Sequence, residues 1–409
     1  MGKMTKKYFT IITFFLVIMV IGGCTEQNQS EDAGGEKQDH QPDGPSALPP
    51  IFSEDIRENV EALFDSHKGE VPKDVFNEHM QNLSETELQN SMLGGPTFHD
   101  IYVAYSSHET GATLEGTTDE NGFVLEDRTL IIEHGSVPDA VIDPDGTIRL
   151  YFVDTCPLRK IWVAVDDHVD DKVTAADLVT LYEDGYVAGN NAFSTAKSTD
   201  GEHFTIESLA IKNLPEDVYV ADPSTCRLEN GSYRLYFLCV LASDCTSADP
   251  ASSTHHRIAS AISTDGTNFV YEGINYDEGE QSMGGGLSDP EVCKTGDYYR
   301  LFIHAGGGRT NNKVLTSYDD GRTFDESSAV DLFGSHSTAG YGLRIVETPV
   351  GYRMYYCENS TTYSATSDTN GETWTMQDEP KVGGRGSMAP VKIPEGSSIT
   401  WKYLLYFHA

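Results

Sequence analysis

The chain has 409 residues, enough for one large all-β domain with additional segments. Its 28 Lys and Arg stand against 64 Asp and Glu, a formal net charge of −36 at pH 7. This charge argues against nucleic acid, and against an anionic membrane surface, as an electrostatic partner. The 21 Tyr and 17 Phe favour a sheet-rich protein.

Residues 1–24 have the organisation of an export signal. Three lysines form a basic start, and an apolar run follows over residues 8–21. The next residues, Ile-Gly-Gly-Cys24, resemble the lipobox of prokaryotic lipoproteins, which implies a signal peptide that is cleaved and a lipid attached to Cys24. An uncleaved transmembrane anchor is the alternative, although the apolar run is short for a full span. On either interpretation the rest of the chain is predicted to be extracytoplasmic and tethered to the cell membrane.

Residues 25–50 are polar and rich in Gly, Pro, Gln, Glu and Asp, a composition typical of a disordered linker. Six further cysteines follow in an exported chain, so disulfides are permitted. Cys239 with Cys245 is the favoured local pair, and the connectivity stays open. The chain has no CxxC pair, so a structural zinc site is not indicated.

One helical segment is predicted, over residues 51–95. Ser53 is a candidate N-cap, and apolar residues between Ile56 and Phe64 share one face at helical spacing. After a break, a second helix is predicted over 73–83 and a short third one beyond it. Because the first helix has an apolar stripe, we expect this segment to pack on the main domain.

Residues 96–409 read as strands and turns throughout, organised as a repeat. A hairpin with an Asp near its start recurs at Pro138–Phe152, Ala221–Leu238 and Ser288–Phe302, and more loosely from Tyr341 and Met388. Each hairpin is the first half of a four-stranded unit. The second half is a strand followed by a box of the form Ser-x-Asp-(x)-Gly-x-x-aromatic.

The boxes are predicted to be tight turns. They occur at Ser198–Phe204, Ser263–Phe269, Ser317–Phe324 and, with Thr369 in place of Asp, Ser367–Trp374. In such a turn the Asp binds backbone N–H groups, the Gly supplies a positive φ, and the aromatic ring packs into the sheet. These residues are therefore interpreted as structural.

The fifth hairpin stops at the end of the chain, and its missing outer half is expected at the other end of the repeat region. There a strand, Ile101–Tyr105, is followed by a box-like segment, Thr118–Phe123. Joining the two ends gives five four-stranded units. The sequence therefore predicts a five-bladed β-propeller closed by its N- and C-terminal segments.

Three carboxylates stand near the start of successive inner strands: Asp139, Asp222 and Asp289. Inner strands line the central channel of a propeller, so we expect these side chains at equivalent positions facing one pocket. Carboxylates gathered there would divide into an acid and a base, as glycoside hydrolysis requires. Two alternatives stay open: the Asp-Pro pairs only shape the strand entry, or the cluster binds a Ca²⁺ ion in the channel. No other cofactor is indicated.

The Asp-Pro hairpins resemble those of the five-bladed propeller glycoside hydrolases that include arabinanases, β-xylosidases, levansucrases and invertases. The boxes are similar to those of sialidases, which carry six blades. The first resemblance implies a carbohydrate substrate, with Asp139 as the base, Asp222 as the orienting carboxylate, and Asp289 or Glu291 as the proton donor.

The chain departs from that family in two places. Ala140 follows Asp139 where the family has Pro, and Ser288 stands where the family has its acidic Glu. The second departure argues against a standard inverting mechanism.

Further residues are candidates for substrate binding. Sialidases bind the carboxylate of their substrate with arginines, and Arg344 is the best channel candidate for such a role here. Arg309 follows a glycine run in a rim loop, and His304 ends a strand near the channel mouth. A surface or structural role is the alternative for each.

Two hypotheses follow. The first is a lipid-anchored, glycosidase-like propeller that hydrolyses or binds a carbohydrate in its central channel. The alternative is a non-catalytic propeller that binds a glycan or a protein at the cell surface, and Ser288 favours it.

Overall fold

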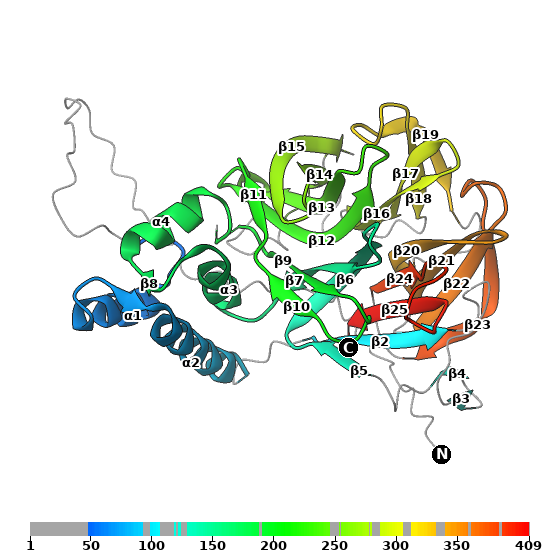
Figure 1. Ribbon diagram of the computed structural model, residues 1–409. Coiled ribbons are helices and arrows are strands. Elements are labelled where there is room, and N and C mark those ends of the chain that lie inside the picture. Colours follow the sequence, from blue (N-terminus) through cyan, green and yellow to red (C-terminus); the bar gives the residue numbers. More distant parts are fainter. Residues whose placement is uncertain are drawn as a thin grey trace, which may run out of the picture.

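The computed structural model describes residues 48–92, 99–106, 118–119, 122–123, 129–187, 190–245, 253, 255–277, 279, 287–305, 312–332, 340–358, 361–383 and 387–408. The predicted signal peptide with Cys24, most of the predicted linker, and Arg309 lie outside these residues. The described chain forms a propeller of five sheets with a helical unit at its side (Figure 1).

Five antiparallel sheets surround the channel, and each forms one blade with its first strand innermost. From the channel outward, blade 1 is β6 (Gly135–Ile142), β7 (Ile148–Asp154), β9 (Phe193–Ser198) and β10 (Thr205–Glu207). Blade 2 is β12 (Val218–Arg227), β13 (Tyr233–Leu241), β14 (His256–Ser263) and β15 (Asn268–Asp277), with β11 (Ala210–Lys212) added in parallel to β15. Blade 3 is β16 (Leu287–Thr295), β17 (Tyr298–Ala305), β18 (Lys313–Ser317) and β19 (Asp325–Asp331). Blade 4 is β20 (Tyr341–Thr348), β21 (Gly351–Glu358), β22 (Thr361–Ser367) and β23 (Thr375–Gly383).

Blade 5 joins the two ends of the repeat region. It consists of β24 (Met388–Lys392), β25 (Tyr403–His408), β2 (Ile101–Ser106) and β5 (Thr129–Ile132). The pairing of β2 with β25 runs from Ile101 opposite His408 to Ser106 opposite Tyr403. The predicted five-bladed propeller and its closure are confirmed.

The sequence did not place the outermost strand of blade 5. The box-like segment over 118–123 contributes only a separate two-stranded ladder, β3 (Thr118–Asp119) with β4 (Gly122–Phe123). The outer strand is β5, which pairs with β2 and leads almost directly into blade 1. The segment nearest in sequence to the first blade thus completes the last one.

The boxes form the predicted turns. In the blade 3 copy, Asp319 Oδ1 accepts the N–H of Thr323 at 2.9 Å, and Ser317 Oγ accepts the N–H of Gly321 at 2.8 Å. Gly321 has a φ of +78°, and the ring of Phe324 is buried. The box that lacks the Asp keeps the same geometry, because Thr369 Oγ1 accepts the N–H of Thr373 at 3.0 Å.

The helical unit contains more helices than the sequence predicted. α1 (Glu54–Ser66) was expected, and Ser53 takes the N-cap position, although its side chain makes no capping hydrogen bond. α2 (Lys73–Met92) is one continuous helix rather than two. Two short strands, β1 (Val71–Pro72) and β8 (Lys172–Val173), pair and link this segment to blade 1.

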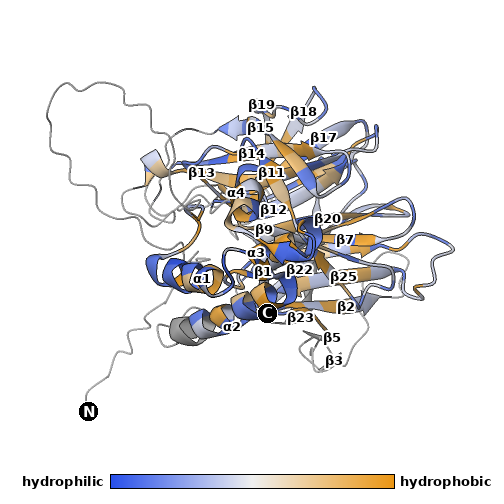
Figure 2. Ribbon diagram, turned by 60° about the vertical axis from the view of Figure 1, so that its left-hand side comes forward, coloured by the Kyte–Doolittle hydropathy of each residue, from blue (hydrophilic) through white to orange (hydrophobic). Residues whose placement is uncertain are grey.

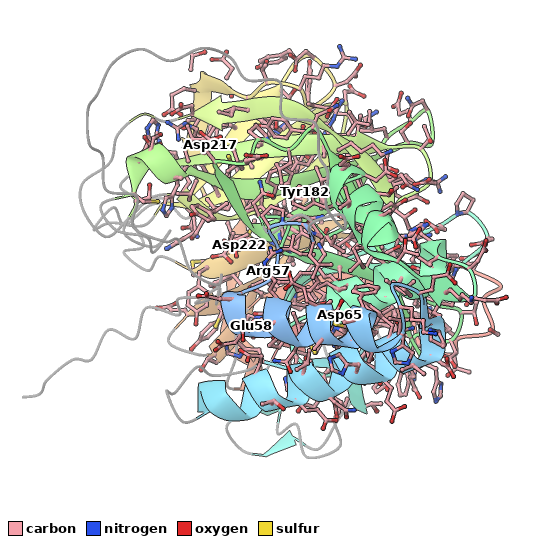
Figure 3. The ribbon with its side chains drawn as sticks, turned by 90° about the vertical axis from the view of Figure 1, so that its left-hand side faces the viewer. Arg57, Glu58, Asp65, Tyr182, Asp217 and Asp222 are labelled. Carbon is pink, nitrogen blue, oxygen red and sulfur yellow. The ribbon has the colours of Figure 1, made fainter. Side chains whose placement is uncertain are left out.

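The prediction that residues 96–409 contain only strands and turns is wrong for one insertion. α3 (Arg159–His168) and α4 (Ala175–Glu183) lie between the second and third strands of blade 1. α4 begins at a capping box of Thr174 and Asp177, a readable sequence signal that was missed. All four helices share one apolar core, which confirms that the N-terminal helices pack on the main domain. Figure 2 shows their polar outward faces, and Figure 3 faces the unit with α1 in front.

Within the described chain, no helix is long and apolar enough to cross a membrane. Cys239 forms no disulfide with Cys245, so the favoured local pair is not present. The reason lies in the sheet: Cys239 belongs to β13 and is fully buried in the core of blade 2.

Candidate functional site

A bulge near the start of each inner strand decides which side chains reach the channel. In blades 1 to 4 the pairing with the second strand shifts at this point. One residue within each of these four bulges has a positive φ, and so does Ser387, which directly precedes β24 in blade 5. We call these residues the mouth tier: Val137, Asp222, Asp289, Gly342 and Ser387. The residues two positions further on pair with Tyr151, Tyr236, Phe302, Tyr355 and Tyr406 of the second strands. We call them the throat tier: Asp139, Ser224, Glu291, Arg344 and Ala389.

The expectation that Asp139 is equivalent to Asp222 and Asp289 is wrong. Asp222 and Asp289 precede their prolines and belong to the mouth tier, whereas Asp139 follows its proline and belongs to the throat tier. Val137 takes the mouth position in blade 1. The structure therefore brings Asp139 together with Glu291 and Arg344, and Asp222 together with Asp289.

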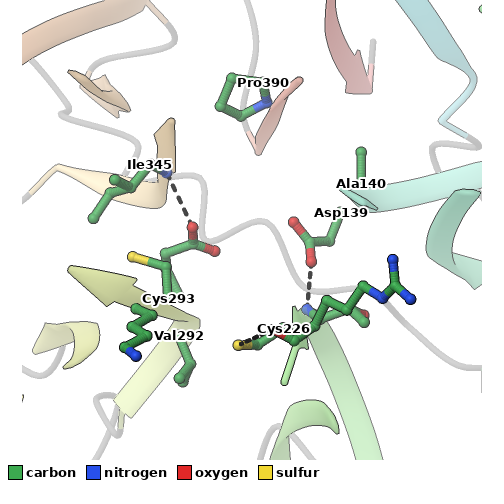
Figure 4. A pocket seen from close by; sticks show the side chains of 11 residues that line it. Asp139, Ala140, Cys226, Val292, Cys293, Ile345 and Pro390 are labelled. Atoms are coloured by element: carbon green, nitrogen blue, oxygen red, sulfur yellow. Dashed lines mark hydrogen bonds between the residues drawn. The ribbon is translucent and has the colours of Figure 1, made fainter. Parts of the chain in front are cut away.

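The throat tier links each blade to the next through hydrogen bonds from backbone N–H groups. Asp139 accepts the N–H of Thr225 from blade 2. Ser224 Oγ accepts the N–H of Val292 from blade 3 at 2.9 Å. Glu291 Oε1 accepts the N–H of Ile345 from blade 4 at 3.0 Å (Figure 4). These side chains are buried, so the bonds hold four inner strands in register around the channel. Ser224 was not identified from the sequence.

Arg344 lies in the channel, where the sequence placed it, and is only 1% exposed. Its terminal nitrogens donate to the carbonyl oxygens of Leu343 at 2.8 Å, Pro223 at 2.9 Å and Pro290 at 3.2 Å. Its Nε lies 3.6 Å from Asp139 Oδ1 and 3.7 Å from Glu291 Oε2 and donates no hydrogen bond. The guanidinium thus compensates two buried carboxylates while its terminal nitrogens bind the backbone.

Burial is the main cause of the pKa shifts of the throat-tier carboxyl groups, Glu291 and Asp139. Burial, followed by the charge of Asp139, raises the pKa of Glu291 to about 8. Burial also raises the pKa of Asp139, against the opposing effects of Arg344 and the hydrogen bond from Thr225. Burial thus favours the protonated form of Glu291, and Arg344 opposes this shift.

A cavity of about 220 Å³ adjoins the throat tier. It follows the inner strands past Asp139 and Glu291, away from the mouth tier, and the thiols of Cys226 and Cys293 face it (Figure 4). Burial raises the pKa of both thiols, so neither is a reactive thiolate at neutral pH.

The mouth tier holds the second pair of carboxylates. The backbone N–H of Asp289 donates to Asp222 Oδ2 over 3.3 Å, and Ser288 Oγ donates to Asp289 Oδ2 over 3.1 Å. Burial, followed by the charge of Asp289, raises the pKa of Asp222 to about 7. Both side chains are partly exposed. An acid whose pKa is raised toward neutrality thus lies beside a second acidic residue.

His304 lies beside this pair, because its residue pairs with Ser288 across blade 3. Its Nδ1 is 3.0 Å from the carbonyl oxygen of Gly340 and 3.1 Å from Asn312 Oδ1. Asn312 Nδ2 also donates to the Gly340 carbonyl, which fixes its Oδ1 as the acceptor. Nδ1 therefore carries the hydrogen, and in the neutral ring Nε2 is an acceptor.

Among the residues that the structure describes, no group of three or more His, Cys, Asp and Glu side chains is arranged to hold a metal ion. The carboxylates are split between two tiers, and two of them are compensated by Arg344.

No protein-family model matches the chain, and no curated protein matches its sequence. Among solved structures, the chain is similar to a thermostable family-43 glycoside hydrolase, with 12% identity over 67% of this chain and 88% of that chain and a TM-score of 0.46. It is similar to a GH43 β-1,3-galactosidase solved with galactodeoxynojirimycin, with 9% identity over 73% and 94% and a TM-score of 0.44. It is also similar to an α-L-arabinofuranosidase from Lactobacillus brevis, with 10% identity over 67% and 90% and a TM-score of 0.45. At TM-scores below 0.5, these likenesses assign the chain neither a family nor an activity.

Proposed function

We propose that the protein binds a carbohydrate at the mouth of its channel and hydrolyses a glycosidic bond there. The observation that carries this proposal is the pair of mouth-tier carboxylates, Asp222 and Asp289, which are linked by a backbone hydrogen bond and of which one has a pKa near neutrality. Glycoside hydrolysis needs one carboxyl group that gives a proton to the leaving oxygen and a second that activates water or attacks carbon.

In this proposal Asp222 is the proton donor and Asp289 is the second carboxylate. The throat-tier residues Asp139, Glu291 and Arg344 are positioning residues, because their polar atoms face the backbone and one another. This division differs from the one that the family resemblance implied, in which Asp139 is the base and Asp222 orients. His304 would accept a hydrogen bond from a sugar hydroxyl through Nε2.

A carbohydrate is chosen because the Asp-Pro hairpins resemble those of propeller glycoside hydrolases. The cellular location is part of the same proposal: a lipid on Cys24 would hold the protein at the outer face of the cell membrane. The basic start, the apolar run and the lipobox-like residues support it.

The test is turnover of a panel of alkyl glycosides, whose leaving oxygen needs a proton, by the full chain in detergent. Asp222→Asn and Asp289→Asn are each expected to lower kcat/KM by about 10²-fold or more, the usual contribution of a positioned acid or base. Asp325→Asn is the matched control, because Asp325 is exposed on the outer strand of blade 3 and its carboxylate accepts hydrogen bonds from Ser327. The proposal is wrong if neither Asp222→Asn nor Asp289→Asn changes turnover.

A second candidate is favoured by one observation. Val137, at the mouth position of blade 1, has an apolar side chain where a third carboxylate was expected. A mouth with two carboxylates rather than three fits a propeller that binds a glycan without cleaving it. Saturable binding of an oligosaccharide by the wild-type protein, with no turnover of any glycoside, would support this candidate over hydrolysis.

A further inference from the structure

A groove of about 440 Å³ lies on blade 3, far from the channel mouth. Its walls come from β17, β18 and β19 and from the box turn of blade 4. Tyr298 lies in it, next to the turn that joins β16 to β17. Ser288 and His304 pair at the other end of these two strands, so groove and mouth are at opposite ends of the blade. The volume is in the range of small-molecule sites.

Two exposed tyrosines form the apolar part of the groove. Tyr298 is 43% exposed and Tyr318 is 68% exposed. Their rings meet edge to face, with ring centroids 5.4 Å apart and an interplanar angle of 76°. Each ring therefore leaves much of its surface to solvent. Val330, 49% exposed, lies in the same groove.

The propeller fold does not require these tyrosines. Four blades have equivalent pairs of residues across their second and third strands: Ile148 with Ser198, Tyr233 with Ser263, Tyr299 with Ser317 and Tyr352 with Ser367. The residue before the first member is Tyr298 in blade 3, but Thr147, Ser232 and Gly351 in blades 1, 2 and 4. The residue after the second member is Tyr318 in blade 3, but Thr199, Thr264 and Asp368 in blades 1, 2 and 4. Small or polar residues at these positions are therefore compatible with the fold. Of the four blades compared, blade 3 is the one that carries both rings.

The polar floor of the groove differs from the equivalent positions in blades 1 and 2. In blades 1 and 2 the equivalent arginines, Arg149 and Arg234, pair with a glutamate from the outermost strand of the same blade, at 2.8 Å and 2.7 Å. Arg300 instead reaches Glu372 on blade 4 at 3.0 Å, and its Nε donates to Thr295 Oγ1 at 2.9 Å.

These contacts hold the side chain of Arg300 in place at the floor of the groove. Its side chain is 5% exposed, whereas that of Glu372 is 63% exposed. The second terminal nitrogen of Arg300 has no hydrogen-bond partner among the described residues. This nitrogen supplies a donor in the groove that Tyr298 and Tyr318 also line, and the exposed Glu372 supplies an acceptor.

We propose that this groove is a second carbohydrate-binding site, which takes a neutral saccharide. The rings of Tyr298 and Tyr318 would pack against the C–H faces of sugar rings, while Arg300 and Glu372 would bind sugar hydroxyls. A neutral rather than an acidic saccharide follows from the charge of the molecule, −36, and from the exposed carboxylate of Glu372 at the rim. The proposal does not depend on hydrolysis at the mouth.

The test is affinity gel electrophoresis of the full chain in detergent. The gels contain β-1,3-glucan, β-1,4-xylan, α-1,5-arabinan, β-1,4-mannan or, as the acidic arm, polygalacturonate. The test variant is Tyr298→Ser with Tyr318→Thr, the residues that blade 2 carries. The control is Val270→Thr, an equally exposed apolar residue on blade 2. The melting temperature of each variant checks folding.

We expect at least one neutral polysaccharide to retard the wild type, and the tyrosine variant to bind it at least tenfold more weakly at an unchanged melting temperature. Val270→Thr, and a mouth variant with Asp222→Asn and Asp289→Asn, should bind like the wild type. The proposal is overturned if no neutral polysaccharide retards the wild type or if polygalacturonate alone does. It is also overturned if the tyrosine variant binds normally or if the mouth variant alone loses binding. If the mouth variant loses turnover but is still retarded in the gel, the groove binds the polysaccharide independently of the mouth, as we propose.

Discussion

The backbone N–H of Asp289 lies 3.3 Å from Oδ2 of Asp222, so the mouth carboxylates of two neighbouring blades are held side by side. The bulges place both residues at a positive φ, 51° for Asp222 and 48° for Asp289. A left-handed backbone is costly for a residue other than Gly, and such conformations cluster at functional sites. The hydrolytic hypothesis rests on this pair, and the first two predictions test it.

Asp222 is expected to matter only when the leaving group needs a proton. With an alkyl glycoside, Asp222→Asn should lower kcat/KM by about 10²-fold or more, because no acid protonates the leaving oxygen. With a dinitrophenyl glycoside, whose leaving group departs as an anion, the loss should be below about tenfold. Equal losses on both substrates would contradict the role of proton donor.

The pH profile follows from the same group. Asp222 must be protonated to act, and burial together with Asp289 raises its pKa to about 7. kcat/KM for the alkyl glycoside should therefore fall as the pH rises through about 7. With the dinitrophenyl glycoside, this alkaline decline should be absent. A decline at the same pH with both substrates would assign it to another group.

Glu291 is expected to make stability depend on pH. Its pKa is about 8 in the folded protein against an ordinary value of 4.5, so the folded state holds the proton more tightly. This contribution is fully present below about pH 4.5 and is lost as the pH rises through about 8. Relative to Glu291→Gln, the free energy of unfolding of the wild type should fall by about 2–4 kcal/mol across that range. Urea denaturation at several pH values measures it, with the exposed Glu395→Gln as the control.

The throat arginine is expected to be essential for stability. Arg344→Met leaves two buried carboxylates without their cation and three carbonyl oxygens without their donor. We expect a loss of about 3–5 kcal/mol in the free energy of unfolding, and little rescue by Arg344→Lys, because one ammonium does not replace the planar fork. Urea denaturation at pH 7 tests this. An unfolding free energy close to that of the wild type would show that Arg344 does not hold the throat together.

Two glycines, Gly321 in a box turn and Gly146 in the turn between β6 and β7, separate steric crowding from backbone strain. At Gly321 a Cβ would collide with Tyr236 Oη, whereas at Gly146, with a similar positive φ, it would meet nothing within 4 Å. Gly146→Ala should cost about 1 kcal/mol from the left-handed backbone alone. Gly321→Ala should cost about 1–3 kcal/mol more, because it also overpacks a buried contact. Similar melting temperatures of the two variants would contradict this account.

The sequence predicted those parts of the fold that depend on local chemistry. The boxes were readable because Ser317, Asp319 and Gly321 each do what their side chains favour in any tight turn. The closure by β2 was readable because an orphan strand with alternating character stood at the start of the repeat. α3 and α4 were missed because they are short and interrupt a blade.

The site was less predictable, because a bulge changes which residue faces the channel. Pro138 and Pro223 occupy the same place in their bulges, so Asp139, which follows its proline, lies in another tier than Asp222, which precedes its proline. Aligning the repeats on their prolines would have revealed this difference. The partnership of Asp139, Glu291 and Arg344 joins three blades, so it follows only from the closed ring.

The pairing of β2 with β25 also has a consequence for how the chain folds. The two strands are about 300 residues apart in sequence, so their contact closes the longest loop in the domain and costs more chain entropy than any hairpin. Each of the first four blades can form from consecutive residues as they are synthesised, whereas the ring stays open until β25 is made. Until then the apolar faces by which blade 1 and blade 4 pack on blade 5 are uncovered. We therefore expect closure to be the slow, late step of folding, and the open ring to be the species most prone to aggregate.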